Sequence, residues 1–296
     1  MKSSAHRPAL HLLVLEVWLL GLAAPAFPQA SSGTCPASDD LTEFPATDET
    51  CGNQSDVRSA TDSFPGADSL GEREVSPRLL LPNILQDQKP VWLFPLHVVE
   101  GEHLEPTLIL AGAAAGLVAL DPYDEPYFRN SSGFNSFKTG PLRGRNTSLG
   151  IVLAPAGLYL AGLARKDSYA ENTALLAVEA LADTQILDLG MKAIDGRLHP
   201  SDIPPHGDFT HTWFKYPGSA LNPGSFPSGH AISAFGVAAV FSARYGRHRW
   251  VPWVAYGLAS LAALSRIPDQ AHFPSDVFAG AALGYAVSRF VVLSAR

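Results

Sequence analysis

The sequence is poor in cysteine, in basic charge and in long uninterrupted apolar runs. Its 296 residues include two cysteines, and 21 basic residues stand against 28 acidic ones, which gives a net charge of -7. Two cysteines are too few for a disulfide-stapled miniprotein, and an acidic balance argues against a basic nucleic-acid binder. The 46% share of hydrophobic residues excludes a chain that is disordered throughout. What remains is a folded chain, long enough to bury a sizeable core.

The negative charge is concentrated in one stretch near the N-terminus. Residues 31–78 contain ten acids and three bases, so this stretch carries -7 by itself, and the remaining 18 acids and 18 bases cancel. The stretch is rich in Ser, Thr, Asp, Pro and Gly and shows no sustained apolar period, which predicts a disordered acidic linker without chemistry. Cys35 and Cys51 both lie in it; a disulfide between them and two free thiols both stay open.

The first thirty residues have the pattern of a secretory signal peptide. Lys2 and Arg7 precede an apolar run from Ala9 to Ala26, and small residues of the A-x-A type follow. The mature chain is therefore predicted to be exported, to the cell envelope on its periplasmic or extracytoplasmic face. An uncleaved membrane anchor is the alternative.

The region from residue 105 to 296 is predicted to be an all-α domain, a bundle of about six core helices. Its apolar segments have helical length, are rich in Ala, Leu and Gly, and lack the alternation of strands. They span residues 107–120, 149–164, 170–191, 229–244, 250–265 and 275–293. The lead-in at 79–104 is punctuated by proline and is predicted to be extended or in short turns.

Most of these segments are shorter than the roughly 18 uninterrupted apolar residues that indicate a membrane span. The mean hydropathy of +0.07 is also low for a protein with many spans. We therefore expect a soluble or membrane-apposed bundle, with an integral membrane protein as the close alternative.

Three short segments, far apart in the sequence, hold the residue types that a phosphate site needs. The first runs from Lys192 to Pro200, where Gly196 is placed to end a helix. The second, Pro227-Ser228-Gly229-His230, opens a helix whose free N–H groups suit an anion. The third runs from Ser265 to Asp276 and contains an arginine and a histidine just ahead of the last helix.

In this order, the three segments resemble the signature of the phosphatidic acid phosphatase type 2 and vanadium haloperoxidase superfamily, written KxxxxxxRP, PSGH and SRxxxxxHxxxD. The resemblance covers roughly residues 105–296. It implies a helical bundle and a phosphohydrolase that needs no metal or other cofactor. The implied substrates are phosphate monoesters, lipid phosphates or diphosphates, cleaved through a phosphohistidine intermediate.

The resemblance also implies a role for each matching residue. His272 corresponds to the nucleophile, Asp276 to the carboxylate that orients it, and His230 to the group that protonates the leaving alcohol and then activates water. The remaining matched residues correspond to the groups that bind phosphate oxygens: Lys192, Ser228, Gly229 and Arg266.

One position departs from the signature, because His199 stands where the family has arginine before proline. A residue before proline tends to be extended, and residues i and i+2 of an extended run face the same way. We therefore expect Arg197 to point at the phosphate beside His199 and to replace part of the missing guanidinium. Phosphate binding is then weaker, or the pH optimum is more acidic, because His199 is cationic only below its pKa.

Two rival functions stay open. A vanadate-dependent haloperoxidase would use the same pocket with vanadate as its cofactor. An impaired relative would bind a phosphate or a lipid headgroup without turnover. In every case the expected partner is a phosphorylated small molecule or a lipid phosphate, with contact to a membrane in the lipid case, and no nucleic acid.

Overall fold

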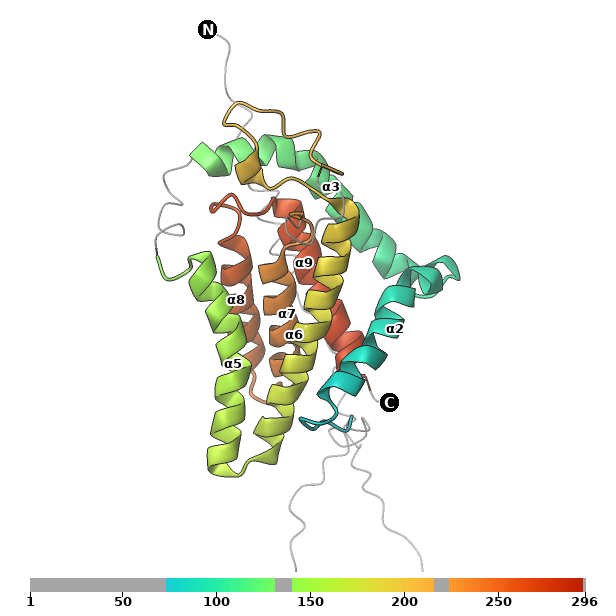
Figure 1. The fold of residues 1–296 in the computed structure, drawn as a ribbon, viewed down its shortest axis with the longest axis vertical. Helices are drawn as coiled ribbons and strands as arrows, with labels where there is room; N and C mark the ends of the chain where they lie inside the picture. The colour runs from blue at the N-terminus through green and yellow to red at the C-terminus, as the bar shows by residue number, and fades with distance from the viewer. Residues whose placement is uncertain (1–72, 131–139, 216–223, 295–296) are drawn as a thin grey trace, which may run out of the picture. The chain divides into compact units, whose positions relative to one another are not determined.

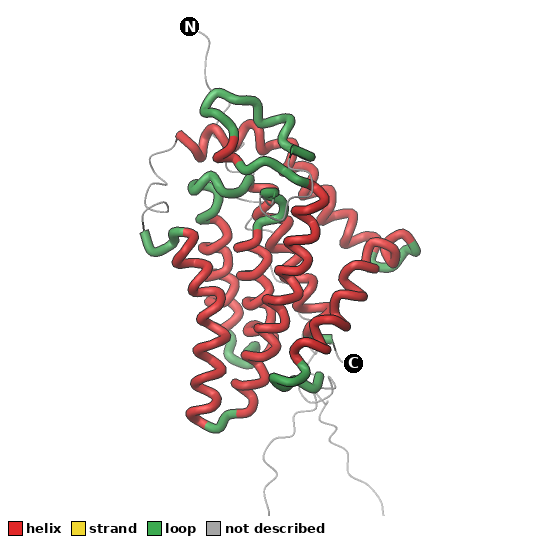
Figure 2. Tube along the Cα trace, viewed as in Figure 1, coloured by secondary structure: helices red, strands yellow, loops and turns green. Residues whose placement is uncertain are grey.

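A computed structural model of the chain describes residues 73–130, 140–215 and 224–294. The predicted signal peptide, most of the acidic linker and both cysteines lie outside the described residues. Within the described ranges the regular structure is helical throughout, without a strand, as the sequence predicts (Figure 2).

In the described part of the chain, the elements follow one another as seven α-helices and two short pieces of other helix types (Figure 1). The α-helices are α2 (Leu80–Val99), α3 (Leu104–Asn130), α5 (Gly144–Arg165), α6 (Ser168–Asp195), α7 (Gly229–Arg244), α8 (Trp250–Leu264) and α9 (Pro274–Val287). A 3-10 turn, η2 (Pro200–Asp202), follows α6, and a π-helical turn, η3 (Ser288–Val292), continues α9. Six of the α-helices overlap the six predicted segments.

Helix α7 forms the centre of the bundle and packs against α6, α8 and α9. All ten of its residues from Ala231 to Val240 are buried. Close approach of α9 depends on glycine, because a Cβ at Gly284 would lie 2.1 Å from the carbonyl oxygen of Ile232. The ends of α6 and α7 and the start of α9 are thereby fixed relative to one another.

Helix termini are set by the local signals read in the sequence. Gly196 ends α6 in the left-handed conformation, with φ of 50°. The side chain of Ser228 caps α7 by accepting from the N–H of Ala231. Pro274 is the first residue of α9, and the carboxylate of Asp276 accepts from the N–H of Phe273 at 2.9 Å.

Helix α2 corrects the prediction of an extended or turn-like lead-in, since it is helical across Pro90 and Pro95. Tertiary contacts overcome the local cost of proline there. The amide of Gln88 donates to Asp183 of α6 at 2.8 Å, and the ring of Trp92 covers Gly190 so closely that a Cβ there would lie 2.4 Å from it.

The end of the predicted linker also packs on the bundle. Arg73 is almost fully buried and forms ion pairs with Asp87 of α2 at 2.8 Å and with Glu179 of α6 at 3.4 Å. The amide of Asn83 donates to the same Glu179 at 2.7 Å. These contacts hold α2 against α6, so Arg73, which was expected to lie in the linker at 31–78, packs on the bundle instead.

Three of the described helices are long and apolar enough to cross a membrane: Leu104–Asn130, Gly144–Arg165 and Pro274–Val292. In the first two, only 11% and 17% of the apolar window is buried inside the protein. Side chains such as Ile109, Val152 and Leu160 are therefore exposed on α3 and α5. The apolar segments expected at 107–120 and 149–164 were shorter than these helices, and the longer helices support membrane association.

Candidate functional site

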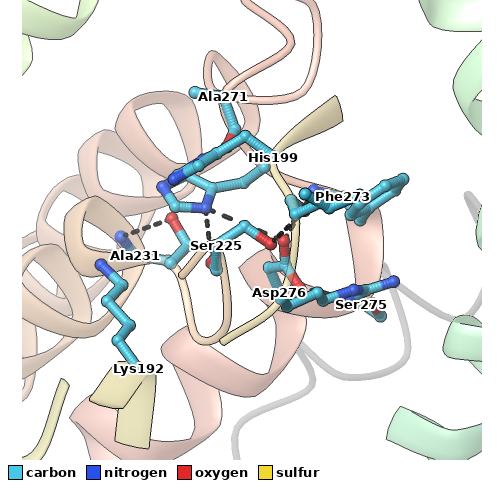
Figure 3. Close-up of polar contacts among 12 residues, drawn as sticks. Lys192, His199, Ser225, Ala231, Ala271, Phe273, Ser275 and Asp276 are labelled. Carbon is cyan, nitrogen blue, oxygen red and sulfur yellow. Dashed lines mark hydrogen bonds and ion pairs between the residues drawn. The ribbon is translucent and has the colours of Figure 1, made fainter. Parts of the chain in front are cut away.

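The residues singled out in the sequence meet at one end of the bundle. Lys192 lies in the last turn of α6, His199 follows on the connecting loop, and His230 opens α7. Figure 3 shows Lys192 on one side of the Ser225 segment and Asp276 on the other, with His199 beside them. In Figure 1, the C-terminal part of α3 crosses this end of the bundle.

His272 is buried just ahead of α9, with 5% of its surface exposed. Its Nδ1 atom lies 2.8 Å from the carbonyl oxygen of Ser225 and 3.8 Å from Oδ2 of Asp276. A carbonyl oxygen only accepts, so Nδ1 carries the proton and Nε2 keeps its lone pair. Burial lowers the pKa of His272 to about 4, although Asp276 opposes the shift. The ring is therefore neutral near pH 7.

His230 is held by the first two turns of α5. Its Nε2 atom lies 2.7 Å from the hydroxyl oxygen of Ser148 and 3.1 Å from the carbonyl oxygen of Gly144. Burial lowers the pKa of His230, and the positive charges of Arg266 and Lys192 lower it further. A histidine in this setting gives up its proton readily, which suits a group that protonates a departing oxygen.

Two cations flank the start of α7. The ammonium of Lys192 pairs with Asp188 one turn earlier at 2.9 Å, and it lies so near the backbone of Gly229 that a Cβ there would be 3.3 Å from it. The guanidinium of Arg266 pairs with Asp269 at 2.7 Å and lies against Gly144, where a Cβ would come within 2.1 Å of Nη1. Glycine at both positions leaves room for the cations beside the helix ends.

The backbone donors at the start of α7 are divided between the fold and the open site. Ser228 is fully buried; its N–H donates to the carbonyl of Asp276 at 2.9 Å and its hydroxyl caps the helix, so both are occupied by the fold. Among the described residues, no acceptor is bonded to the N–H groups of Gly229 and His230. The expected binding group at Ser228 is thus structural in this state, and its neighbours offer the donors of an anion site.

Arg197 differs from its expected orientation. Its guanidinium is 1% exposed and donates to Asp276 Oδ1 at 2.5 Å, to Ser275 at 2.8 Å and to Asp121 Oδ2 at 2.6 Å. Its donors are therefore committed to buried carboxylates, and it does not turn beside His199 towards a phosphate. The reason is Asp121 on α3, a counter-charge that no local pattern reveals.

His199 lies close to the predicted nucleophile. Its Nδ1 atom is 2.6 Å from the carbonyl oxygen of Ala271, so this nitrogen carries a proton, and its ring centroid is 5.6 Å from that of His272. The side chain thus occupies the edge of the site, where the family signature has arginine. No group of three or more His, Cys, Asp or Glu side chains among the described residues gathers at a metal-binding spacing.

Sequence reasoning missed five side chains or carbonyls that contact the site. Asp188 carried a signal, because it stands four residues before Lys192 on the same helix face. Ser225, Asp269, Ser148 and Asp121 carried none, and the last two come from helices distant in sequence.

The match to known families falls on this same part of the chain. Residues 173–296 match the family model described as the PAP2 superfamily. This part of the chain is thus similar to the PAP2 superfamily. The matched region contains Lys192, His230 and His272 together with most of α6 and all of α7 to α9, whereas α3 and α5, which contribute Asp121 and Ser148, precede it.

Two curated proteins of Porphyromonas gingivalis resemble the chain over 100 residues each. The lipid A 1-phosphatase is 36% identical, over 33% of this chain and 21% of the relative. The lipid A 4'-phosphatase is 31% identical, over 34% of this chain and 41% of the relative. The matches thus span about a fifth and two fifths of these relatives. No solved structure matches the chain.

Proposed function

We propose that the protein is a membrane-associated phosphohydrolase that removes phosphate from a lipid phosphate through a phosphohistidine on His272. The observation that carries the proposal is the convergence of His272, His230, Lys192 and Arg266 around the start of α7. This set supplies a nucleophile, a proton donor and two cations, which are the parts that phosphoryl transfer requires.

The first step would form a bond between His272 Nε2 and phosphorus. Lys192, Arg266 and the N–H groups of Gly229 and His230 bind the phosphate oxygens and offset the charge that develops on them. As the bond from phosphorus to the ester oxygen breaks, His230 gives its proton to the departing alkoxide. The free alcohol leaves, and the phosphoryl group stays on the imidazole of His272, now cationic.

In the second step, His230 is neutral and accepts a proton from a water molecule. The oxygen of that water attacks phosphorus, the bond to Nε2 breaks, and inorganic phosphate is released. His272 and His230 return to their starting states, so one water is consumed per ester cleaved. All charge stabilisation in this scheme comes from side chains and backbone N–H groups, and no metal or cofactor takes part.

Two features favour a lipid phosphate as substrate. The curated relatives are phosphatases of lipid A, a phosphorylated lipid, and two of the helices framing the site, α3 and α5, have apolar surfaces open to their surroundings. The signal-peptide pattern of the sequence favours a site outside the cytoplasm, which is the side proposed for the substrate.

The test is a phosphate-release assay on the purified full chain. Lipid phosphates and soluble phosphate monoesters are compared, with detergent and in vesicles, using the wild type and His272→Ala. We expect release from lipid phosphates that requires His272. Binding of these lipids without release in the wild type would contradict the proposal and favour a headgroup-binding protein. Halide oxidation that requires added vanadate would favour the haloperoxidase.

A further inference from the structure

A buried line of charges runs from the site to helix α3. Arg197 lies between two carboxylates, with Nη1 2.5 Å from Asp276 and Nη2 2.6 Å from Asp121, and each of the three side chains is at most 1% exposed. The rings of Trp213 and Phe273 lie 4.4 and 4.2 Å from the guanidinium carbon. Packing and hydrogen bonds thus leave the guanidinium one orientation.

Asp121 also binds the first turn of α9. Its Oδ1 atom accepts from the N–H of Ser275 at 3.2 Å, and Oδ2 accepts from the hydroxyl of the same residue. Ser275 directly precedes Asp276. Asp121 of α3 is therefore linked indirectly to the carboxylate beside His272 in two ways, through the backbone of α9 and through Arg197. Asp121 lies outside the region that matches the superfamily, and the signature does not include it.

The charge of Asp276 is shared between Arg197 and His272. Its Oδ1 atom faces the guanidinium, and its Oδ2 atom lies 3.8 Å from Nδ1 of His272. If Asp276 were the only counter-ion of Arg197, the guanidinium would take most of the electrostatic stabilisation that Asp276 can give, because both groups are buried and poorly screened. The carboxylate of Asp121 is a second counter-ion, so more of that stabilisation is left for His272.

We propose that Asp121 is a positioning residue for phosphoryl transfer, which neutralises Arg197 so that Asp276 stabilises the imidazolium formed when His272 is phosphorylated. The inference rests on the proposed function. In this proposal, α3 contributes to the reaction electrostatically. Asp121 acts through Arg197 and Asp276 and does not contact the substrate.

The test compares Asp121→Asn with Asp124→Asn, a second buried carboxylate of the same helix α3. Loss of one negative charge from the cluster lowers the pKa of His272, and one pKa unit corresponds to a factor of ten. Burial raises the pKa of Asp121 itself to about 6, so its negative charge is present only above that pH. At pH 7 we expect kcat of Asp121→Asn to fall about tenfold, with KM changed less than about twofold, and this deficit should disappear as the pH falls below about 6.

The other charged and titratable groups that face His272 are Asp276, Lys192 and His199, and they are unchanged in both variants. A merely structural role for Asp121 would lower the amount of folded enzyme without changing the shape of the pH profile. Asp124→Asn should therefore keep the pH profile of the wild type. Equal pH profiles for Asp121→Asn and Asp124→Asn would overturn the proposal.

A second pair of variants covers the case in which Asp121→Asn fails to fold. Arg197→Gln removes the cation through which Asp121 acts and should raise the pKa of His272, and adding Asp121→Asn to this variant should leave that pKa unchanged. The pKa is read by NMR of histidine-labelled protein, which needs no turnover. If the wild type releases no phosphate, the proposed function fails while this titration still decides the inference; no rise of the pKa in Arg197→Gln, or a lower pKa on adding Asp121→Asn to it, would refute the inference.

Discussion

The imidazole of His272 is bound by the backbone carbonyl of Ser225, at 2.8 Å, more closely than by the carboxylate of Asp276. The carbonyl fixes the tautomer, so in the proposed mechanism Asp276 has a different role, which is to stabilise the positive charge that the ring gains during the reaction. The loop before α7 then prepares the proposed nucleophile, and α9 supplies the carboxylate for its charged product.

The pH dependence of kcat/KM should be bell-shaped with an acidic optimum. His272 must be neutral to attack, and its pKa of about 4 sets the acidic limb. His230 must be protonated to assist the leaving group, and its pKa is lowered from 6.5, so activity should decline again before neutral pH. Initial rates measured from pH 3 to 9 check this profile, and an optimum above pH 7 would speak against these roles.

Gly144→Ala should weaken phosphate binding, because the added Cβ would lie 2.1 Å from Nη1 of Arg266 and displace the guanidinium. We expect KM to rise roughly tenfold, the scale of about 1.4 kcal/mol for one charge-assisted hydrogen bond. Gly150→Ala on the same helix is the matched control, since a Cβ there meets nothing within 4 Å. Steady-state kinetics of the two variants should differ; the same KM in both would remove Gly144 from the site.

His199→Arg should lower KM at neutral pH. The variant restores a permanent cation where the signature has one, at a position whose ring now lies 5.6 Å from that of His272. KM measured at pH 5 and pH 7.5 tests this, and kinetics unchanged at both values would show that the residue does not meet the phosphate.

Asp183→Asn should reduce the loss of stability at alkaline pH. Burial and the nearby Asp87 raise the pKa of Asp183 to about 8 from an ordinary value of 3.8, so the folded state binds an extra proton between these values. The free energy of unfolding therefore falls as pH rises through that window. Asparagine cannot ionise, and it can still accept from Gln88.

Denaturant unfolding at pH 5 and pH 8 provides the measurement for Asp183. The wild type should lose more stability than Asp183→Asn between the two values, and its helix α2 should become more accessible to protease. An identical loss in both proteins would mean that this carboxyl group does not titrate in the folded chain.

Much of the fold was predictable because it is encoded locally. Gly196, Ser228 and Pro274 mark helix ends by their backbone preferences, and the apolar segments between them have the length of helices. Helix α2 was not predictable, since its two prolines disfavour a helix and only contacts with α6, such as that of Gln88 with Asp183, stabilise it.

The site was predictable only as far as its sequence signature extends. Lys192, His230, Arg266 and His272 meet as the signature implies, but the orientation of Arg197 depends on Asp121, 76 residues away on another helix. In the same way, Ser148 reaches His230 across 82 residues. Contacts of this kind arise from packing, and neither spacing nor composition encodes them.

The central claim is that His272 carries the phosphoryl group during the reaction. The most direct measurement is a rapid quench of wild-type protein with a radiolabelled lipid phosphate, followed by peptide mapping of the label. We expect an alkali-stable, acid-labile phosphoryl group on the peptide that contains His272. Turnover with no label on this peptide, or label that persists in His272→Ala, would contradict the account.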